Sequence, residues 1–240
     1  TIIVKPILVL AGGFGSRLKS VVSDVPKPLA PVCGKPFLMH LIEHLVFQGA
    51  REFVLLLYYE AELVRSMIAK NVDRSYLDGV KITSIIEDRP LGTGGSIMNA
   101  INAFNINESF LVVNADTWLG GGLKQLSLSS PNSIAAVKVK DCSRYGAMVM
   151  DGKKIERFLE KESSSSDGLI NAGLYHLNPD VFAGFSESSS FSLEADIFPL
   201  VIGNGMLSAI QIDTDFIDIG IPEDYFRFCS WIESGKTSEL

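Results

Sequence analysis

Residues 7–18 read ILVLAGGFGSRL, an apolar strand-like run that leads directly into a glycine loop. Glycines let a backbone turn tightly, so that several N–H groups can point toward one anion. Arg17 adds a planar, forked cation that matches phosphate oxygens. The loop lacks the GK[ST] ending of a Walker loop, and the G-x-G-x-x-G spacing of a dinucleotide fingerprint, counted from Gly13, ends at Leu18. We therefore predict a phosphate-binding loop of another kind, directly after the first strand.

A second cation follows on a stiff segment. Residues 26–32 read PKPLAPV, and the three prolines hold Lys27 on an extended backbone, which lowers the entropy cost of aiming its ammonium group. Residues 1–36 carry five basic side chains against one acidic side chain, whereas the whole chain has a formal net charge of −7. This asymmetry indicates a local anion site rather than a general affinity for polyanions.

The first half of the chain alternates between strand-like and helical periodicity. Strand-like runs lie at 7–11, 53–58, 81–86 and 110–114, and helical patterns lie at 36–48, 60–70 and 94–104. A βαβα order predicts an α/β fold in which helices cover a mostly parallel sheet. Because ligands bind beyond the carboxyl ends of such strands, we expect the loops 12–27, 87–95 and 115–118 to face one crevice.

The second half has shorter strand-like pieces separated by turn residues. They lie at 133–139, 145–150, 154–160 and 169–177, with helical patterns near 194–202 and 222–232 and a last strand near 207–219. This pattern predicts a partly antiparallel insertion. No repeat and no linker divides the chain, so we expect one domain over 1–240, with a nucleotide-binding half to about residue 115 and a sugar-phosphate-binding half from 116.

Composition excludes several classes of protein. The chain has 240 residues, 47% of them hydrophobic, which is enough to bury a core. It has no apolar run of the length that a membrane helix needs, and the first ten residues are too short for a signal peptide. Its acidic balance disfavours nucleic acid as a partner, and three cysteines without a CxxC motif fit a reducing cytoplasm. We expect a cytoplasmic enzyme with no membrane partner, and a homodimer is an open alternative to a monomer.

With these residues in place, the chain resembles the sugar-phosphate nucleotidylyltransferases. LAGGFGSRL followed by PKPLAPVCGKPF matches the signature of that family, and the similarity covers nearly the whole chain. It continues through EDRPLGTGG (87–95), NAD (114–116), FLEK (158–161), NAG (171–173), SLEADIFP (192–199) and DIGIPEDY (218–225). The resemblance implies a Rossmann-like, three-layer αβα (GT-A-like) fold with a mixed, mostly parallel central sheet.

The resemblance also implies an activity, namely the transfer of a nucleoside monophosphate to a sugar 1-phosphate with release of pyrophosphate. Residues 12–28, read as a block, are most similar to the branch that uses GTP and D-glycero-α-D-manno-heptose 1-phosphate. Mannose 1-phosphate with GTP, and glucose 1-phosphate with a thymidine or uridine nucleotide, are the alternatives. A non-catalytic sugar-nucleotide sensor would require a broken metal site, and both acids of that site are present.

The family roles can be assigned residue by residue. Arg17, Lys27 and Asp116 would be catalytic, and Asp116 and Asp218 would hold Mg²⁺, since two carboxylates with phosphate oxygens suit a hard octahedral cation. The nucleotide-binding residues would be Leu10, Ala11, Gly12, Gly13, Gly15, Ser16, Arg17, Glu87, Pro90, Gly92, Thr93, Asn114 and Asp116. The sugar-phosphate-binding residues would be Lys27, Gly146, Glu160, Lys161, Asn171 and Asp218.

The implied reaction needs no covalent enzyme intermediate. An oxygen of the sugar 1-phosphate attacks the α-phosphorus of the nucleotide in line, so catalysis rests on positioning and charge neutralisation. Arg17 would stabilise the leaving pyrophosphate, Lys27 the α-phosphate region, and Mg²⁺ the surrounding negative charge. The phosphate nucleophile is already ionised at neutral pH, so no general base is required.

Glu87 bears on the choice of base. It lies five residues before Gly92, where relatives that use uridine or thymidine nucleotides commonly carry glutamine. A carboxylate only accepts hydrogen bonds, so it matches the adjacent N1–H and N2 donors of guanine. The glycines of LGTGG (91–95) would let a base lie close to the backbone. We therefore favour GTP.

Less specific interpretations of these residues are also open. Asp116 alone could cap a helix over 117–128, and Asp218 alone could be a turn residue. Glu160 and Lys161 could form a surface ion pair, and Glu87 could be an ordinary carboxylate at the end of a strand. Two positions depart from the family pattern: Ala115 replaces a glycine, which should leave Asp116 in place, and Ile221 replaces a threonine beside Asp218.

One motif points to another class of enzyme. His40, Glu43 and His44 spell the H-x-x-E-H pattern of inverted zinc proteases, and histidines at i and i+4 on a helix can share one zinc ion. His176 is the only other histidine, and no motif supplies a third ligand. We therefore interpret the two histidines as solvated residues on the polar face of an amphipathic helix.

Overall fold

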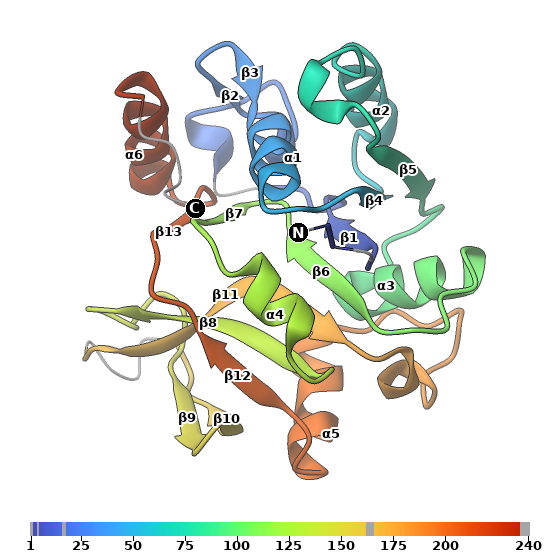
Figure 1. Ribbon diagram of the computed structural model, residues 1–240, viewed down its shortest axis with the longest axis vertical. Helices are drawn as coiled ribbons and strands as arrows, with labels where there is room; N and C mark the ends of the chain where they lie inside the picture. The colour runs from blue at the N-terminus through green and yellow to red at the C-terminus, as the bar shows by residue number, and fades with distance from the viewer. Residues whose placement is uncertain (1, 4, 16–17, 162–165, 236–240) are drawn as a thin grey trace. The chain divides into compact units, whose positions relative to one another are not determined.

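The computed structural model describes residues 2–3, 5–15, 18–161 and 166–235 (Figure 1). The chain forms two compact units. Unit 1 comprises Thr1–Arg89, Val113–Gly121 and Asp215–Leu240, and unit 2 comprises Pro90–Val112 and Gly122–Thr214. Two later segments, one from the middle of the chain and one from its carboxyl-terminal end, thus group with the amino-terminal residues. The expectation of a single domain with a division near residue 115 stays a prediction.

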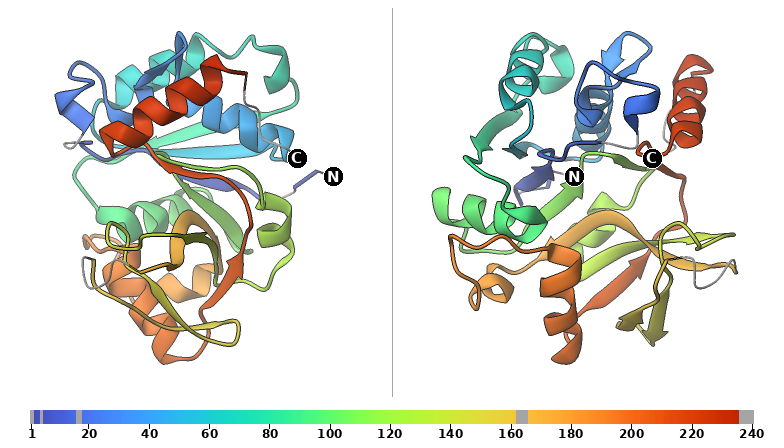
Figure 2. Two further views of the ribbon diagram at one scale, coloured as in Figure 1. Left: turned by 90° about the vertical axis from the view of Figure 1, so that its left-hand side faces the viewer. Right: turned by 180° about the vertical axis from the view of Figure 1, so that it is seen from behind.

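Unit 1 contains parallel strands in the order β5-β4-β1. β1 (Ile7–Leu10) pairs with β4 (Glu52–Leu57), which pairs with β5 (Lys81–Ile86), and Ile7 lies opposite Phe53. Nearly all residues of β1 and β4 are buried, which is why these strands are continuous apolar runs. Figures 1 and 2 show α1, α2 and α6 on one side of these strands.

The α-helices of unit 1 lie close to the predicted helical positions, and the short elements were not predicted. The α-helices are α1 (Phe37–Phe47), α2 (Ala61–Ala69) and α6 (Pro222–Glu233), and the 3-10 turns are η1 (Leu18–Ser20), η2 (Lys27–Leu29) and η3 (Ser75–Leu77). Two short antiparallel pairs complete the unit: β2 (Pro31–Val32) with β3 (Lys35–Pro36), and β7 (Thr117–Leu119) with β13 (Phe216–Asp218). β6 (Phe110–Asn114) begins in unit 2 and ends in unit 1.

Unit 2 contains a mixed sheet in the order β11-β8-β12-β10-β9. Its strands are β8 (Ser133–Val139), β9 (Met148–Asp151), β10 (Lys154–Phe158), β11 (Gly168–Leu177) and β12 (Ser208–Gln211). Only the β12–β8 pair among them is parallel. The helical elements are α3 (Gly92–Ala103), α4 (Leu123–Leu128), η4 (Pro179–Phe182), η5 (Leu193–Ile197, a π-helical turn) and α5 (Phe198–Gly203).

The predicted fold class is confirmed: strands in parallel and antiparallel pairs form the central sheet, and helices flank it. One predicted element is wrong. The strand expected over 207–219 is two strands, β12 and β13, which belong to different sheets and different units. The polar residues Asp213, Thr214 and Asp215 interrupt the apolar alternation between them, and that break carries the chain from one unit to the other.

Each unit has its own core of large buried side chains. Phe37, Phe53 and Phe228 are fully buried in unit 1, and Phe110, Tyr175 and Phe198 are fully buried in unit 2. Burial of one such aromatic ring contributes on the order of 2 kcal/mol. In the described ranges, no helix combines the length and the apolar character needed to cross a bilayer.

Candidate active site

The glycine loop after β1 is fixed to the end of β4. Ala11 N–H donates to Leu56 O at 3.1 Å, and Tyr59 N–H donates to Gly12 O at 3.4 Å. A β-carbon on Gly12 would lie 3.2 Å from the Tyr58 backbone nitrogen, so this close approach favours glycine. The backbone of the loop is therefore held by main-chain contacts. Of the predicted phosphate contacts, Ser16 and Arg17 lie outside the described residues.

Lys27 packs directly against this loop. Gly15 has φ +61°, and a β-carbon on it would lie 2.8 Å from the β-carbon of Lys27. Only glycine fits both the backbone conformation and the space. The glycine loop and the lysine of PKPLAPV, which lies twelve positions after Gly15, thus form one cluster.

The two predicted metal-binding acids lie in the same cluster. The Lys27 ammonium is 3.0 Å from the Asp116 carboxylate, in a half-buried ion pair. β7 and β13 place Asp218 opposite Thr117, and Ile219 N–H donates to Asp116 O at 2.9 Å. Three segments that are far apart in the sequence therefore bring Lys27, Asp116 and Asp218 together within unit 1.

The local structure around the acids excludes the less specific interpretation of Asp116. The residues after it form the strand β7, so Asp116 does not cap a helix over 117–128. Asp218 does accept a turn hydrogen bond, from Gly220 N–H to its Oδ1 at 2.8 Å. A β-carbon on Gly220 would lie 2.9 Å from this oxygen and 3.0 Å from the Lys27 nitrogen. The Asp218 carboxylate is thus held in a turn and adjacent to Lys27 at once.

The donor set of this cluster fits a hard divalent cation. Carboxylate oxygens are the ligands that Mg²⁺ prefers, and it usually takes only one or two of them, with substrate phosphates and water completing the octahedron. Asp116 and Asp218 offer that number. Within the described ranges, no three His, Cys, Asp or Glu side chains group closely enough to hold a metal by themselves.

The other predicted nucleotide contacts of unit 1 lie at strand ends. Leu10 ends β1 and Asn114 ends β6, and Ala115 N–H donates to Leu10 O at 3.1 Å. Glu87 directly follows β5, is buried, and donates its N–H to Leu57 O at 2.9 Å. Alanine at 115 leaves Asp116 in the cluster.

The family model described as "Nucleotidyl transferase" matches residues 6–234.

The chain belongs to the nucleotidyl transferase family.

Two relatives named D-glycero-alpha-D-manno-heptose 1-phosphate guanylyltransferase are similar over nearly the whole chain. The one from Campylobacter jejuni is 36% identical over 92% of this chain and 97% of its own length. The one from Aneurinibacillus thermoaerophilus is 34% identical over 91% and 94%. The crystal structure of HddC from Yersinia pseudotuberculosis complexed with GMP-PN matches with a TM-score of 0.83 at 36% identity, covering 95% of this chain and 99% of that one.

In this nucleotidyl transferase, the glycines of LGTGG serve packing within unit 2. Gly92 has φ +71°, and a β-carbon on it would overlap the Phe191 carbonyl oxygen. That oxygen accepts from Gly94 N–H at 3.0 Å, and Thr93 Oγ1 accepts from Leu193 N–H at 2.8 Å. The space that a β-carbon on Gly92 or Gly94 would occupy is filled by Phe191. Roles for Pro90, Gly92 and Thr93 at a nucleotide stay predictions.

The predicted sugar contacts of unit 2 also take part in local structure. Gly146, with φ +76°, donates its N–H to Cys142 O, and a β-carbon on it would lie 2.5 Å from Leu159 O. The Asn171 side chain spans a bulge in β11, accepting from Gly173 N–H at 2.8 Å and donating to Tyr175 Oη at 2.9 Å. Glu160 and Lys161 are exposed. Their contacts with a sugar phosphate stay predictions.

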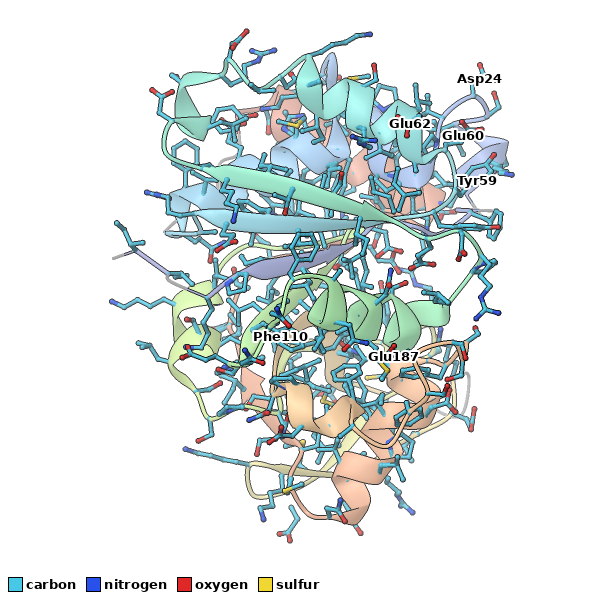
Figure 3. All side chains as sticks on the ribbon, turned by 90° about the vertical axis from the view of Figure 1, so that its right-hand side faces the viewer. Asp24, Tyr59, Glu60, Glu62, Phe110 and Glu187 are labelled. Carbon is cyan, nitrogen blue, oxygen red and sulfur yellow. The ribbon has the colours of Figure 1, made fainter. Side chains whose placement is uncertain are left out.

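An aromatic anchor for the glycine loop could not be found from the sequence. Phe14 lies between two loop glycines and is 51% exposed, yet its ring contacts Tyr58 and Tyr59 at centroid distances of 5.9 and 5.1 Å. The Lys19 ammonium lies 5.5 Å from the Tyr59 ring. Figure 3 shows Tyr59 and Glu60 at the same edge of unit 1 as Asp24. The only signal in the sequence is a large aromatic residue in a loop that otherwise favours small ones.

The interpretation of the two H-x-x-E-H histidines as solvated is wrong. Their ring nitrogens and Glu43 also have other partners than a zinc ion. His40 Nε2 lies 2.8 Å from Val32 O, and His44 Nε2 lies 2.8 Å from Leu119 O, so each ring donates this N–H to a carbonyl. Both rings are buried, and His44 stacks on Trp118. Burial is the largest cause that lowers the pKa of both histidines, while the carbonyl contacts act in the opposite direction. Glu43 pairs with Lys35 instead of a metal.

Proposed function

We propose that this nucleotidyl transferase moves GMP from GTP to D-glycero-α-D-manno-heptose 1-phosphate and releases pyrophosphate. The cluster of Lys27, Asp116 and Asp218 against Gly15 carries the reaction class, because it combines a cation with two acids beside a loop suited to phosphate. The choice of base and sugar is supported by the 36% identity with the Campylobacter jejuni heptose enzyme over nearly the full length of both chains.

The residues of the cluster divide the work of an in-line displacement. Lys27 neutralises charge at the α-phosphate as the sugar-phosphate oxygen attacks, and Arg17 neutralises the departing pyrophosphate. Asp116 and Asp218 hold a divalent cation, which we take to be Mg²⁺ and which, when bound, neutralises phosphate charge. The Asp116–Lys27 ion pair also keeps the ammonium group extended toward the acids before substrate arrives.

We propose that the Glu87 side chain recognises the guanine base. Its carboxylate is buried at the end of β5, where an acceptor pair toward N1–H and N2 of guanine discriminates against a pyrimidine. Glu87→Gln should lower kcat/KM for GTP and raise the relative use of dTTP or UTP. Hydrogen-bonded sites discriminate strongly because a wrong partner leaves a buried polar group unpaired. An unchanged order of preference among the nucleotides would refute this role.

A pyrophosphate-release panel tests the proposal as a whole. Purified enzyme with Mg²⁺ is given each of four nucleoside triphosphates against heptose, mannose and glucose 1-phosphates. We expect the highest kcat/KM for GTP with the heptose compound, and loss of release in Asp116→Asn. Gly184→Ala is the matched control, because a β-carbon there meets no atom within 4 Å.

The panel also identifies the alternatives. A maximum for mannose 1-phosphate with GTP would keep the base and replace the sugar. A maximum for glucose 1-phosphate with dTTP or UTP would overturn both. Binding of a sugar nucleotide without turnover in any combination would favour a sensor. The homodimer alternative is tested separately, by measuring the mass of the purified protein with light scattering.

A further inference from the structure

Gly220 lies at the centre of the charged cluster without carrying a functional group. It is buried at the end of β13, and its N–H donates to Asp218 Oδ1. The Lys27 nitrogen and this Asp218 oxygen both lie within 3.0 Å of the point that a β-carbon on Gly220 would occupy. The Lys27 nitrogen reaches Asp116 from the same place. The space that a side chain on Gly220 would fill is therefore bordered by the charged ends of Lys27 and Asp218.

The backbone does not explain why this residue is a glycine. Gly220 is absent from the residues with positive φ, so an L-amino acid is compatible with its conformation. Gly15, in contrast, combines φ +61° with a close contact, so both causes act there. At Gly220 only the steric cause acts, and the closest atoms that a methyl group would meet are the terminal atoms of the Asp218 and Lys27 side chains.

We propose that Gly220 is a positioning residue for nucleotidyl transfer. Its lack of a side chain lets the Lys27 ammonium lie beside the Asp218 carboxylate while it pairs with Asp116. This inference rests on the proposed function, in which these three groups meet the phosphates and the cation. Gly220 acts on the reaction through the Lys27 ammonium, because alanine at this position keeps the N–H that binds Asp218.

The substitution Gly220→Ala separates this role from a structural one. A methyl group on residue 220 would lie 2.9 Å from Asp218 Oδ1 and 3.0 Å from the Lys27 nitrogen, so these side-chain ends must shift by a few tenths of an ångström. The lysine end is the longer and more flexible of the two, so it yields at little cost in stability. The displaced ammonium is no longer aimed correctly, so kcat should fall about tenfold, with a smaller change in KM for GTP. The midpoint of urea unfolding should stay at the wild-type value.

A second measurement needs neither substrate nor metal. In the wild type, the Lys27 side chain is 15% exposed and paired with Asp116, so an amine-directed acylating reagent should label it slowly. Gly220→Ala should raise the labelling rate at Lys27 several-fold, as read by mass spectrometry of the peptide. Lys81, whose side chain is 67% exposed, reports the intrinsic rate in both proteins and should not change.

A double-mutant cycle with Lys27→Met completes the test. If Gly220 acts through the ammonium group, Gly220→Ala should cause little further loss of rate in the Lys27→Met background. An equal loss in both backgrounds would overturn the proposal, as would wild-type kcat and labelling in Gly220→Ala. A clear drop in the unfolding midpoint would overturn it too, because the fold itself would then need the glycine. If the wild type releases no pyrophosphate with any substrate pair, the proposed function fails, while labelling and unfolding still decide the role of Gly220.

Discussion

Three glycines of the two units lie beside different kinds of atom. In unit 1, the missing side chain of Gly220 leaves room for the ends of the Lys27 and Asp218 side chains. In unit 2, the missing side chains of Gly92 and Gly146 leave room for the carbonyl oxygens of Phe191 and Leu159. A side-chain end can move aside at little cost, whereas a backbone carbonyl in a packed segment cannot. The glycines of the family motifs therefore have two roles. In unit 1 a glycine makes room for charged side chains, and in unit 2 glycines make room for a neighbouring segment of backbone.

The largest expected effect tests the charged cluster of unit 1. Asp218→Asn keeps the size of the side chain and removes its charge, so pyrophosphate release should fall about 10³-fold, as for loss of a group that stabilises developing charge. The rate is measured with saturating substrates, and far-ultraviolet circular dichroism checks the fold. A rate within a few-fold of the wild type would remove Asp218 from the cluster's function.

The next effect tests the packing of unit 2. Gly92→Ala forces a non-glycine residue to φ +71° and against the Phe191 carbonyl, so the free energy of unfolding should fall by about 3 kcal/mol. Urea denaturation without ligand measures it, with Gly184→Ala as the control. A loss of activity without loss of stability would make Gly92 resemble Gly220 and break the contrast between the units.

A smaller effect is expected at the aromatic anchor of the glycine loop. Phe14→Ala removes two ring contacts, each worth about 1 kcal/mol, so KM for GTP should rise about 30-fold if both hold the loop in its binding conformation. Phe14→Tyr keeps the ring and should retain the wild-type KM. Equal behaviour of the two variants would mean that the exposed ring is incidental to binding.

The smallest effect concerns pH. His40 and His44 have pKa values lowered below 6.5 in the folded chain, so unfolding takes up protons once the pH falls below that value. Stability is therefore full above about pH 6.5 and declines as the pH falls toward the folded pKa values. Urea unfolding at pH 7.5 and 5.5 measures the decline, and His44→Gln should reduce it.

The same measurement locates the effect. Both histidines lie on α1 in unit 1, so the protection of α1 amides against hydrogen exchange, corrected for the intrinsic pH dependence of exchange, should fall at the lower pH. An equal fall in protection in unit 2 would indicate a general acid effect. A decline in stability that His44→Gln leaves unchanged would assign the proton uptake to other groups.

Local sequence patterns are sufficient to predict part of the fold. The apolar runs of β1 and β4 predict buried parallel strands, whereas a common site for Lys27, Asp116 and Asp218 is expected only from the family resemblance. The sequence does not predict that Gly220 lies against Lys27, because that contact joins positions nearly two hundred residues apart. The burial of His40 and His44 also cannot be predicted from local sequence, for a similar reason. Helical periodicity identifies one covered face, whereas segments carrying Val32 and Trp118 cover these rings as well.

The pairing of β7 with β13 has a consequence for how such a chain can diversify. Residues 122–214 depart after β7 and return before β13, and Gly120 N–H donates to Asp215 O at 2.8 Å where the two strands meet. An excursion whose ends are tied together can be lengthened, trimmed or exchanged while its root keeps the same geometry. The main chain thus fixes the separation of the two acids independently of the residues between them, and the excursion can be remodelled without moving either acid.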